Sequence, residues 1–502
     1  MRRLRFALVV ASFLTCCLSN SVAQSPAPPS AQTTALEKPA ASIPLSDEQT
    51  LKAQSLLNKG DLDGALEAAD AALKLKPDSP EANLVMGQVL FRRGKIAESN
   101  EHIQKTLKVD PSNVQAWLAL ARVAQIISLR KKAVACVQKA HSLAPDDPDV
   151  ILAWVSTRPT GAEKIAAYQQ FIEAEKKRTG TEPAWAKQRI EDLKQLGDIR
   201  TDALASPMGH YDVPIDYILR DSSHLQGWGV KVAIGNCKPV KLMIDTGAQG
   251  ILIGDGLAQK CGVKKLYAGF ITSIGSKPPL GIYTGLADVL QVGPVQYKNV
   301  LIDVEDRTPV GDESGLIGTS LLGKFLINLN LNDYKLSLDP LPAIPGDDGK
   351  DGPKDRYIAP QMTSYAKVFV VQDHLMIPTK VGADPKPALF IIDTGASNNF
   401  IEQEYVAKLE KLTEESNVVV HGVQGKVQKV FSADDLTLQF AGFRQMNQRL
   451  ITHSLGQMGD IRIAGLLGLP ILRWFTLHID YRDGLVGFEY HEPKGVDTPR
   501  LR

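Results

Sequence analysis

Two stretches of nine residues, at 240–248 and 388–396, follow the same pattern, and this repetition constrains the fold more than any other feature. The first copy reads VKLMIDTGA and the second reads ALFIIDTGA. In each copy an apolar run, the pattern of a buried strand, ends at Asp-Thr-Gly-Ala, where the glycine marks a turn. The chain therefore contains two related units, and each presents one aspartate, Asp245 or Asp393, at the end of a strand.

A second matching element lies further along each unit. It reads Gly-Leu-Ile-Gly at residues 315–318 and Gly-Leu-Leu-Gly at residues 465–468. Short runs rich in Val, Ile and Leu alternate with glycine turns throughout both units, which is typical of β-rich domains. The sequence therefore predicts two all-β lobes, at residues 208–341 and 359–495, joined by a linker at 342–358 that is rich in Gly, Asp, Lys and Pro.

The order of these motifs resembles the retropepsin-like aspartic proteases, and the resemblance covers residues 209–492 with one full copy in each lobe. It implies a pseudo-two-fold bilobal protease in which Asp245 and Asp393 face each other as the catalytic pair. Two carboxyl groups about 3 Å apart cannot both ionise, so they share one proton. In this family water attacks the peptide bond directly, so the resemblance implies no metal and no other cofactor.

The residues that follow the two aspartates receive supporting roles from the same resemblance. They are Thr246, Gly247, Ala248, Thr394, Gly395 and Ala396. The threonines are expected to interlock through hydrogen bonds between hydroxyl and backbone, and the glycines allow close approach of the backbone to the carboxyl groups. The alanines stand where pepsin-like enzymes often carry serine, so the charged form loses one hydrogen bond. We therefore expect a mildly acidic to near-neutral pH optimum.

The resemblance also implies that one or two flaps cover an extended peptide substrate. Glycines permit a hairpin tip that opens and closes. The flap candidates are Ile274, Gly275 and Gly281 in the first lobe and Gly422 and Gly425 in the second. The alternative is that these stretches are ordinary surface turns.

The segment before the lobes carries an internal repeat of 34 residues. Pro77, Pro111 and Pro145 keep this spacing, and small residues recur with the same period. Small residues allow two helices to cross closely, and proline ends each unit. The pattern resembles the tetratricopeptide repeat, and it predicts an all-α solenoid with capping helices over residues 46–200. Such a domain is expected to bind a partner protein or an extended peptide.

The N-terminus has the pattern of a signal peptide. Basic residues precede an apolar run at residues 6–18, and small residues follow at 21–23. We expect residues 1–23 to be removed on export to the periplasm or the medium, and residues 24–45 to form a disordered linker. A lipid-anchored form through Cys16 or Cys17 is the less favoured alternative. The apolar run is too short to span a bilayer, and nothing downstream is longer.

Two further global features limit the function classes. The formal net charge is +1, so the overall charge of the protein does not favour binding to nucleic acid. Cys237 and Cys261 could form a bridge in an oxidising compartment, although the sequence leaves this open, and the cysteine spacing fits no zinc motif. The sequence therefore predicts an exported aspartic endopeptidase whose repeats bind a partner or substrate protein. The alternatives are a catalytically silent scaffold and a protease of very narrow or self-processing specificity.

Overall fold

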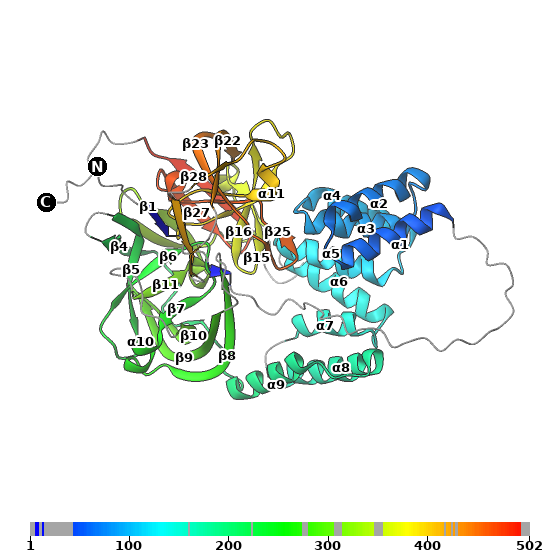
Figure 1. The fold of residues 1–502 in the computed structure, drawn as a ribbon. Helices are drawn as coiled ribbons and strands as arrows, with labels where there is room; N and C mark the ends of the chain where they lie inside the picture. The colour runs from blue at the N-terminus through cyan, green and yellow to red at the C-terminus, as the bar shows by residue number, and fades with distance from the viewer. Residues whose placement is uncertain are drawn as a thin grey trace.

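A computed structural model describes most of the chain. The described residues are 6–9, 13–14, 44–158, 161–221, 224–273, 280–305, 314–345, 355–415, 418–422, 425–426 and 430–492. They form a helical domain beside two β-rich lobes, as Figure 1 shows. No helix among these residues has the length and apolar content that a bilayer crossing requires.

The helical domain consists of antiparallel helix pairs that repeat along the chain. Its helices are α1 (Leu45–Asn58), α2 (Leu62–Leu75), α3 (Pro80–Arg92), α4 (Ile96–Val109), α5 (Val114–Ile126), α6 (Arg130–Leu143), α7 (Pro148–Ser156), α8 (Ala162–Thr179) and α9 (Ala184–Leu196). The small residues of the repeat lie where helices cross: Ser99 is fully buried and donates to the Gly87 carbonyl at 2.7 Å. Thr106 likewise donates to the Pro80 carbonyl at 3.0 Å. The 34-residue spacing therefore marks the helix contacts of a solenoid.

The first lobe contains the first copy of the repeated motif. Its elements are β3 (Ala203–Leu204), β4 (Tyr211–Asp221), β5 (His224–Ile234), β6 (Val240–Asp245), β7 (Ile251–Gly254), α10 (Asp255–Lys260), β8 (Lys264–Ser273), β9 (Leu280–Val292), β10 (Val295–Glu305), β11 (Gly315–Gly318), a 3₁₀ turn (Thr319–Leu322), β12 (Phe325–Asn330) and β13 (Lys335–Pro340). Strand β11 pairs parallel with β6 and antiparallel with β7. The two predicted motifs, at residues 240–248 and 315–318, are thus neighbours in one sheet.

The second lobe repeats this arrangement. Its elements are a 3₁₀ turn (Pro360–Met362), β14 (Ala366–Lys367), β15 (Phe369–Val371), β16 (His374–Val381), β17 (Ala388–Ile392), β18 (Phe400–Glu402), α11 (Gln403–Val406), β19 (Thr413–Glu414), β20 (Val418–Gly422), β21 (Gly425–Lys426), β22 (Phe431–Phe440), β23 (Phe443–His453), β24 (Gln457–Met458), β25 (Ile461–Arg462), β26 (Gly465–Leu467), α12 (Leu469–Leu472), β27 (Phe475–Asp480) and β28 (Leu485–Tyr490). Strand β26 pairs parallel with β17 and antiparallel with β18, as β11 does with β6 and β7.

A sheet shared by both lobes joins them. The hairpin β12–β13 of the first lobe and the hairpin β27–β28 of the second meet through antiparallel pairing of β12 with β27, in which Leu329 lies opposite Leu477. Both leucines are fully buried in the main apolar cluster, which runs through both lobes. The lobes therefore share one core and are not independent units on a flexible linker.

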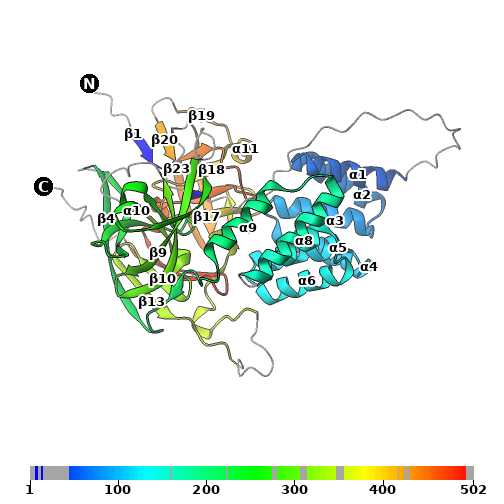
Figure 2. The ribbon, with the colours of Figure 1, turned by 90° about the horizontal axis from the view of Figure 1, so that it is seen from below.

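The helical domain is fixed against the lobes rather than separated from them. Helix α5 contacts β15, α3 contacts β25, and α9 contacts β8 of the first lobe. Figure 2, seen from below, shows α9 reaching from the helical domain to the β-rich part. The N–H groups of Lys131 and Lys132, in the first turn of α6, each donate at 2.8 Å to the carboxylate of Asp355. An acidic group at a helix N-terminus satisfies N–H groups that have no partner within the helix.

Two short strands lie in the segment with the signal-peptide pattern. Strand β1 (Phe6–Val9) pairs parallel with β20, and β2 (Phe13–Leu14) pairs antiparallel with β8. The pairings attach this segment to one hairpin of each lobe. The signal peptide itself stays a prediction.

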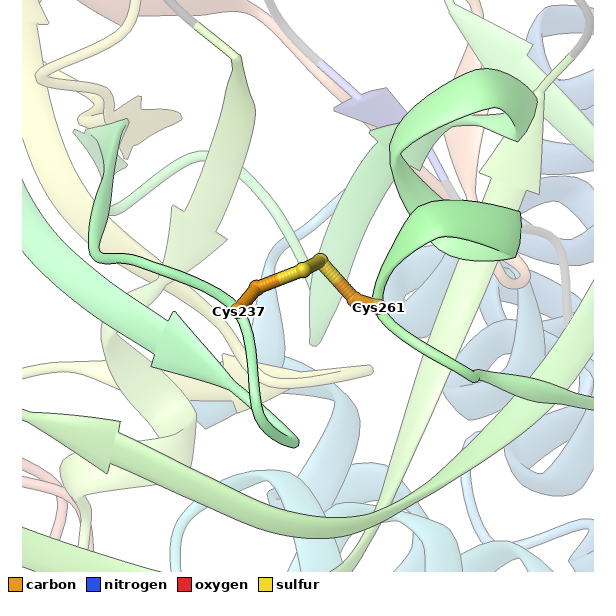
Figure 3. Close-up of a disulfide and its surroundings, with 2 residues drawn as sticks. All are labelled: Cys237 and Cys261. Atoms are coloured by element: carbon orange, nitrogen blue, oxygen red, sulfur yellow. A yellow bond between two sulfur atoms is a disulfide. The ribbon is translucent and has the colours of Figure 1, made fainter.

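A disulfide joins Cys237 to Cys261, with Cα atoms 5.2 Å apart (Figure 3). Cys237 lies in the turn between β5 and β6, and Cys261 follows the last residue of α10. The bond therefore connects the start of β6, the strand that leads to Asp245, to the end of helix α10. Cys136 is a buried free cysteine of α6.

Replacing Cys237 by Ser is expected to lower the free energy of unfolding by about 3 kcal/mol, because a closed loop of this size restricts the unfolded chain. Urea unfolding without reductant measures the change. Dithiothreitol should produce the same loss in the wild type and in Cys136→Ala, and no further loss in Cys237→Ser. Equal stability of Cys237→Ser and the oxidised wild type would contradict the expectation.

Candidate active site

The two predicted catalytic aspartates lie next to each other at the junction of the lobes. Asp245 is the last residue of β6 and Asp393 directly follows β17, and both are fully buried. The carboxyl group of Asp393 faces the backbone of Gly247: a Cβ atom built there would lie only 2.4 Å from Asp393 Cγ. A side chain at residue 247 would therefore collide with the opposite aspartate, which explains the glycine in the motif.

Thr246 and Thr394 form a reciprocal set of hydrogen bonds beneath the carboxyl groups. The N–H of each threonine donates to the Oγ1 of the other at 3.0 Å. The hydroxyl of Thr246 donates to the Ile392 carbonyl at 2.7 Å, and that of Thr394 donates to the Ile244 carbonyl at 2.9 Å. Each hydroxyl therefore both accepts and donates across the junction, and four buried backbone groups are satisfied. This interlock fixes the separation of the two aspartates.

The backbone of each turn holds the carboxyl group of its own aspartate. Gly247 N–H donates to Asp245 Oδ1 at 2.7 Å. Gly395 N–H and Ala396 N–H both donate to Asp393 Oδ1 at 2.9 Å. Hydrogen bonds from N–H groups stabilise the charged form of a carboxylate. The Gly395 N–H also lowers the pKa of Asp245, so backbone N–H groups of both turns support the pair of carboxyl groups.

Burial and the negative charge of Asp393 raise the pKa of Asp245 well above its ordinary value, and the N–H groups of Gly247 and Gly395 oppose this only in part. Asp393 accepts two backbone N–H groups on one oxygen. The arrangement therefore favours a state in which the two carboxyl groups share one proton. Such a pair titrates as a unit.

The last glycine of each Gly-Leu-x-Gly motif lies close to the backbone of the Asp-Thr-Gly-Ala turn in the same lobe. A Cβ atom on Gly318 would lie 2.4 Å from the Ala248 carbonyl oxygen, and one on Gly468 would lie 2.7 Å from the Ala396 carbonyl oxygen. Ala248 and Ala396 are fully buried, so a larger side chain has no space there. The repeated Asp-Thr-Gly-Ala and Gly-Leu-x-Gly motifs therefore form one packed unit in each lobe.

Three supporting residues carry no sequence signal that would identify them. Asn399 accepts the Gly468 N–H at 2.9 Å. The buried Tyr481, in the turn after β27, forms a 2.7 Å hydrogen bond with Thr319 of the first lobe. Both contacts join residues that are distant in sequence, and Asn399, Thr319 and Tyr481 lie outside the repeated motifs. Only the tertiary structure brings them together.

Three of the five flap candidates, Gly281, Gly422 and Gly425, lie in hairpin strands. Gly281 lies in β9 and pairs with Phe270 of β8. Gly422 and Gly425 pair with each other at the tip of the β20–β21 hairpin. Ile274 and Gly275 lie outside the described residues. The flap function of these hairpins stays a prediction.

Family models match three segments of the chain. Residues 56–123 match the tetratricopeptide repeat, residues 230–324 match the "gag-polyprotein putative aspartyl protease" family, and residues 377–471 match the family described as aspartyl protease. The chain combines tetratricopeptide repeats with two retropepsin-like aspartyl protease domains. The resemblance and the fold class predicted from the sequence are thereby confirmed, with the all-α repeats preceding two all-β lobes.

Curated relatives and solved structures are similar to parts of the chain. BBSome complex member bbs-4 of Caenorhabditis elegans is 35% identical over 66 residues, which are 13% of this chain and 14% of that protein. A DnaJ homolog subfamily C member 7 homolog of Schizosaccharomyces pombe is 33% identical over 76 residues, or 15% of this chain and 16% of that protein. The chain thus spans only a small part of the length of these relatives.

Among solved structures, the aspartic proteinase from Irpex lacteus has 13% identity and a TM-score of 0.37, and the match covers 56% of this chain and 98% of that one. The Arabidopsis OM64 TPR domain has 17% identity and a TM-score of 0.21, with 22% of this chain and 90% of that chain covered.

Replacing Thr394 by Val is expected to destabilise the protein by about 2–4 kcal/mol, because the Thr246 N–H and the Ile244 carbonyl lose their buried partner. Thr394→Ser keeps the hydroxyl and serves as the matched control. Its free energy of unfolding should fall by less than about 1.5 kcal/mol, because it lacks only the methyl group. Urea unfolding at pH 7 compares the two. If Thr394→Val and Thr394→Ser lower the free energy of unfolding equally, the hydrogen bonds of the interlock contribute little to stability.

Asp245→Asn is expected to be more stable than the wild type at pH 7. A carboxyl group whose pKa is higher in the folded than in the unfolded state stabilises the fold at low pH, and this contribution is lost as the pH rises through the folded-state pKa. Asparagine does not ionise and so avoids this loss of stability. At most, the loss is about 1.4 kcal/mol for each unit by which the folded-state pKa exceeds the unfolded-state pKa. The gain should shrink as the pH falls toward 3.8, the ordinary pKa of Asp.

Urea unfolding at pH 7 and pH 4 measures this difference. Asp146→Asn, at an exposed site of the helical domain, is the control and should be neutral at both pH values. An Asp245→Asn protein that is less stable than the wild type at pH 7 would contradict a raised pKa of Asp245 in the folded protein.

Proposed function

We propose that this protein is an aspartic endopeptidase that uses Asp245 and Asp393 as a single catalytic dyad. The observation that carries the proposal is the Thr246–Thr394 interlock, because it holds two buried carboxyl groups together in one chain. A fold that only bound peptides would gain nothing from two adjacent buried carboxyl groups, since burying them destabilises the protein. Such an arrangement is typical of sites where pKa values are tuned for catalysis.

The raised pKa of Asp245 suggests how the reaction proceeds. The ionised Asp393 takes a proton from a water molecule, and the water oxygen forms a bond with the scissile carbonyl carbon. The protonated Asp245 donates its proton to the carbonyl oxygen, which relieves the developing charge. In the next step the C–N bond breaks as Asp393 gives its proton to the leaving nitrogen. Asp245 takes a proton from a hydroxyl of the tetrahedral intermediate, a carbonyl group reforms, and the dyad is singly protonated again. No covalent intermediate with the protein is needed.

We further propose that the protein works after export, as a periplasmic or secreted enzyme. The basic and apolar N-terminal pattern supports this, and so does the Cys237–Cys261 disulfide, because such bonds persist in oxidising compartments. We also propose that the tetratricopeptide repeats bind a partner or substrate protein, in line with the family model that they match.

The proposal is tested by incubating the purified protein with a peptide library between pH 3 and pH 8. The wild type should cleave internal peptide bonds, and Asp245→Asn and Asp393→Asn should each lose at least about 10³-fold in kcat, because the dyad acts as a unit. Asp303→Asn, a change at a partly buried aspartate of β10 outside the dyad, is the control and should retain activity.

Cleavage that survives one of the two dyad changes would mean that the lobes act separately. A complete absence of cleavage at every pH, in protein whose fold is intact by circular dichroism, would favour the scaffold alternative over the enzyme.

A further inference from the structure

The two lobes are related by sequence, yet they cover the outer face of their aspartate-bearing strands in different ways. In the first lobe, Met243 of β6 lies in a small apolar cluster with Ala248, Leu252 and Leu316, closed by Ile218 and Ile282. All six residues belong to the first lobe. The strand that carries Asp245 is therefore supported from within its own lobe.

The corresponding residues of the second lobe belong to a cluster that crosses into the helical domain. Pairing in the two sheets shows the correspondence: Leu316 lies opposite Met243 and Leu252, and Leu466 lies opposite Ile391 and Phe400. These lobe-two residues join Ala396 and Leu389 in one apolar cluster with residues of α4, α5 and α6. The helical members of this cluster are Ile96, Ile103, Ala116, Ala119, Leu120, Ala121, Val123, Ile126, Cys136 and Val137.

Strand β17 alternates between these two environments. Ala388, Phe390 and Ile392 lie in the core shared by the lobes, whereas Leu389 and Ile391 lie in the cluster that includes the repeats. Leu389 and Ile391 are 4% and 3% exposed. Alternate residues of a strand point to opposite faces. The outer face of the strand that leads to Asp393 therefore packs in a cluster that includes residues of the helical domain.

The turn between α3 and α4 makes the direct contact. Gly94, at φ +73°, lies so close to Leu389 that a Cβ atom there would be 3.1 Å from both Leu389 Cγ and Cδ1. The next residue, Lys95, donates through Nζ to the Pro387 carbonyl at 2.7 Å, directly before β17 begins. One turn of a repeat thus holds the start of the strand by packing and by a hydrogen bond.

We propose that the helical repeats are a positioning element of the active site, in which Gly94 and Lys95 set the place of Asp393 through β17. The inference rests on the proposed peptidase function for its kinetic test, and it assigns the repeats a second task beside partner binding. It also gives the pseudo-symmetric dyad a built-in asymmetry, because the described residues of the cluster around Met243 include none from the helical domain.

The chain offers a matched pair of variants for the test. Gly60 occupies the same turn one repeat earlier, at φ +81°, with no atom within 4 Å of an added Cβ. Gly60→Ala and Gly94→Ala therefore introduce the same backbone strain, since alanine is disfavoured at positive φ. Only Gly94→Ala also pushes against Leu389. The difference between the two variants isolates the contact with β17.

We expect Gly94→Ala to lower kcat about 3- to 10-fold relative to Gly60→Ala, since displacement of a catalytic group by a fraction of an ångström costs rate steeply. KM should be unchanged, and the pH profile of kcat should move, which a general loss of folded protein would not cause. Leu389→Ala in the Gly94→Ala background should restore part of the rate and reveal coupling in a double-mutant cycle.

A second readout does not need turnover. Hydrogen exchange, followed by mass spectrometry on a peptide that spans residues 388–396, should be faster in Gly94→Ala than in Gly60→Ala. Lys95→Met should have the same effect if Gly94→Ala does not fold, with Lys59→Met, at an exposed position before Gly60, as its control.

Equal kinetics, equal pH profiles and equal exchange in the matched variants would overturn the inference. An inactive wild type that still shows faster exchange in Gly94→Ala would overturn the proposed peptidase function, while the support of β17 by the repeats would stand.

Discussion

The structure depends on the reciprocal hydrogen bonds between Thr246 and Thr394. Each threonine donates its N–H and accepts through its hydroxyl across the junction, so neither turn is complete without the other. Each hydroxyl donates its single proton and accepts one N–H in this network, so its donor is not available for an alternative arrangement. The two lobes must therefore adopt a two-fold relation at this point, and the shared sheet through β12 and β27 extends that relation to the opposite side of the core.

Burial of two carboxyl groups at this junction is unfavourable, and the fold compensates for it only in part. Backbone N–H groups of Gly247, Gly395 and Ala396 stabilise negative charge, but burial still raises the pKa of Asp245. One proton shared by the pair removes most of the remaining repulsion. The raised pKa therefore favours a state in which the pair holds one proton beside one charge, which is the state that general acid and general base catalysis require.

The motifs around the aspartates could be predicted from sequence because their causes are local and repeated. Gly247 and Gly318 are needed where backbones approach too closely for a Cβ atom, and glycine is visible in any sequence. The small residues of the 34-residue repeat, such as Ser99 and Thr106, are fully buried for a similar steric reason. Contacts such as Thr319 with Tyr481 escaped prediction because either residue, alone in the sequence, fits many environments.

The sequence by itself determined that the chain has a helical repeat followed by two β-rich lobes, each with an Asp-Thr-Gly-Ala turn, because periodicity and turn chemistry are properties of neighbouring residues. The tertiary structure decided which surfaces meet. It placed Leu389 and Ile391 of β17 against the repeats, closed the matching cluster around Met243 within the first lobe, and joined Cys237 to Cys261. Leucine, isoleucine and methionine are buried equally well by any apolar neighbour, so their partners follow from packing and not from their identity.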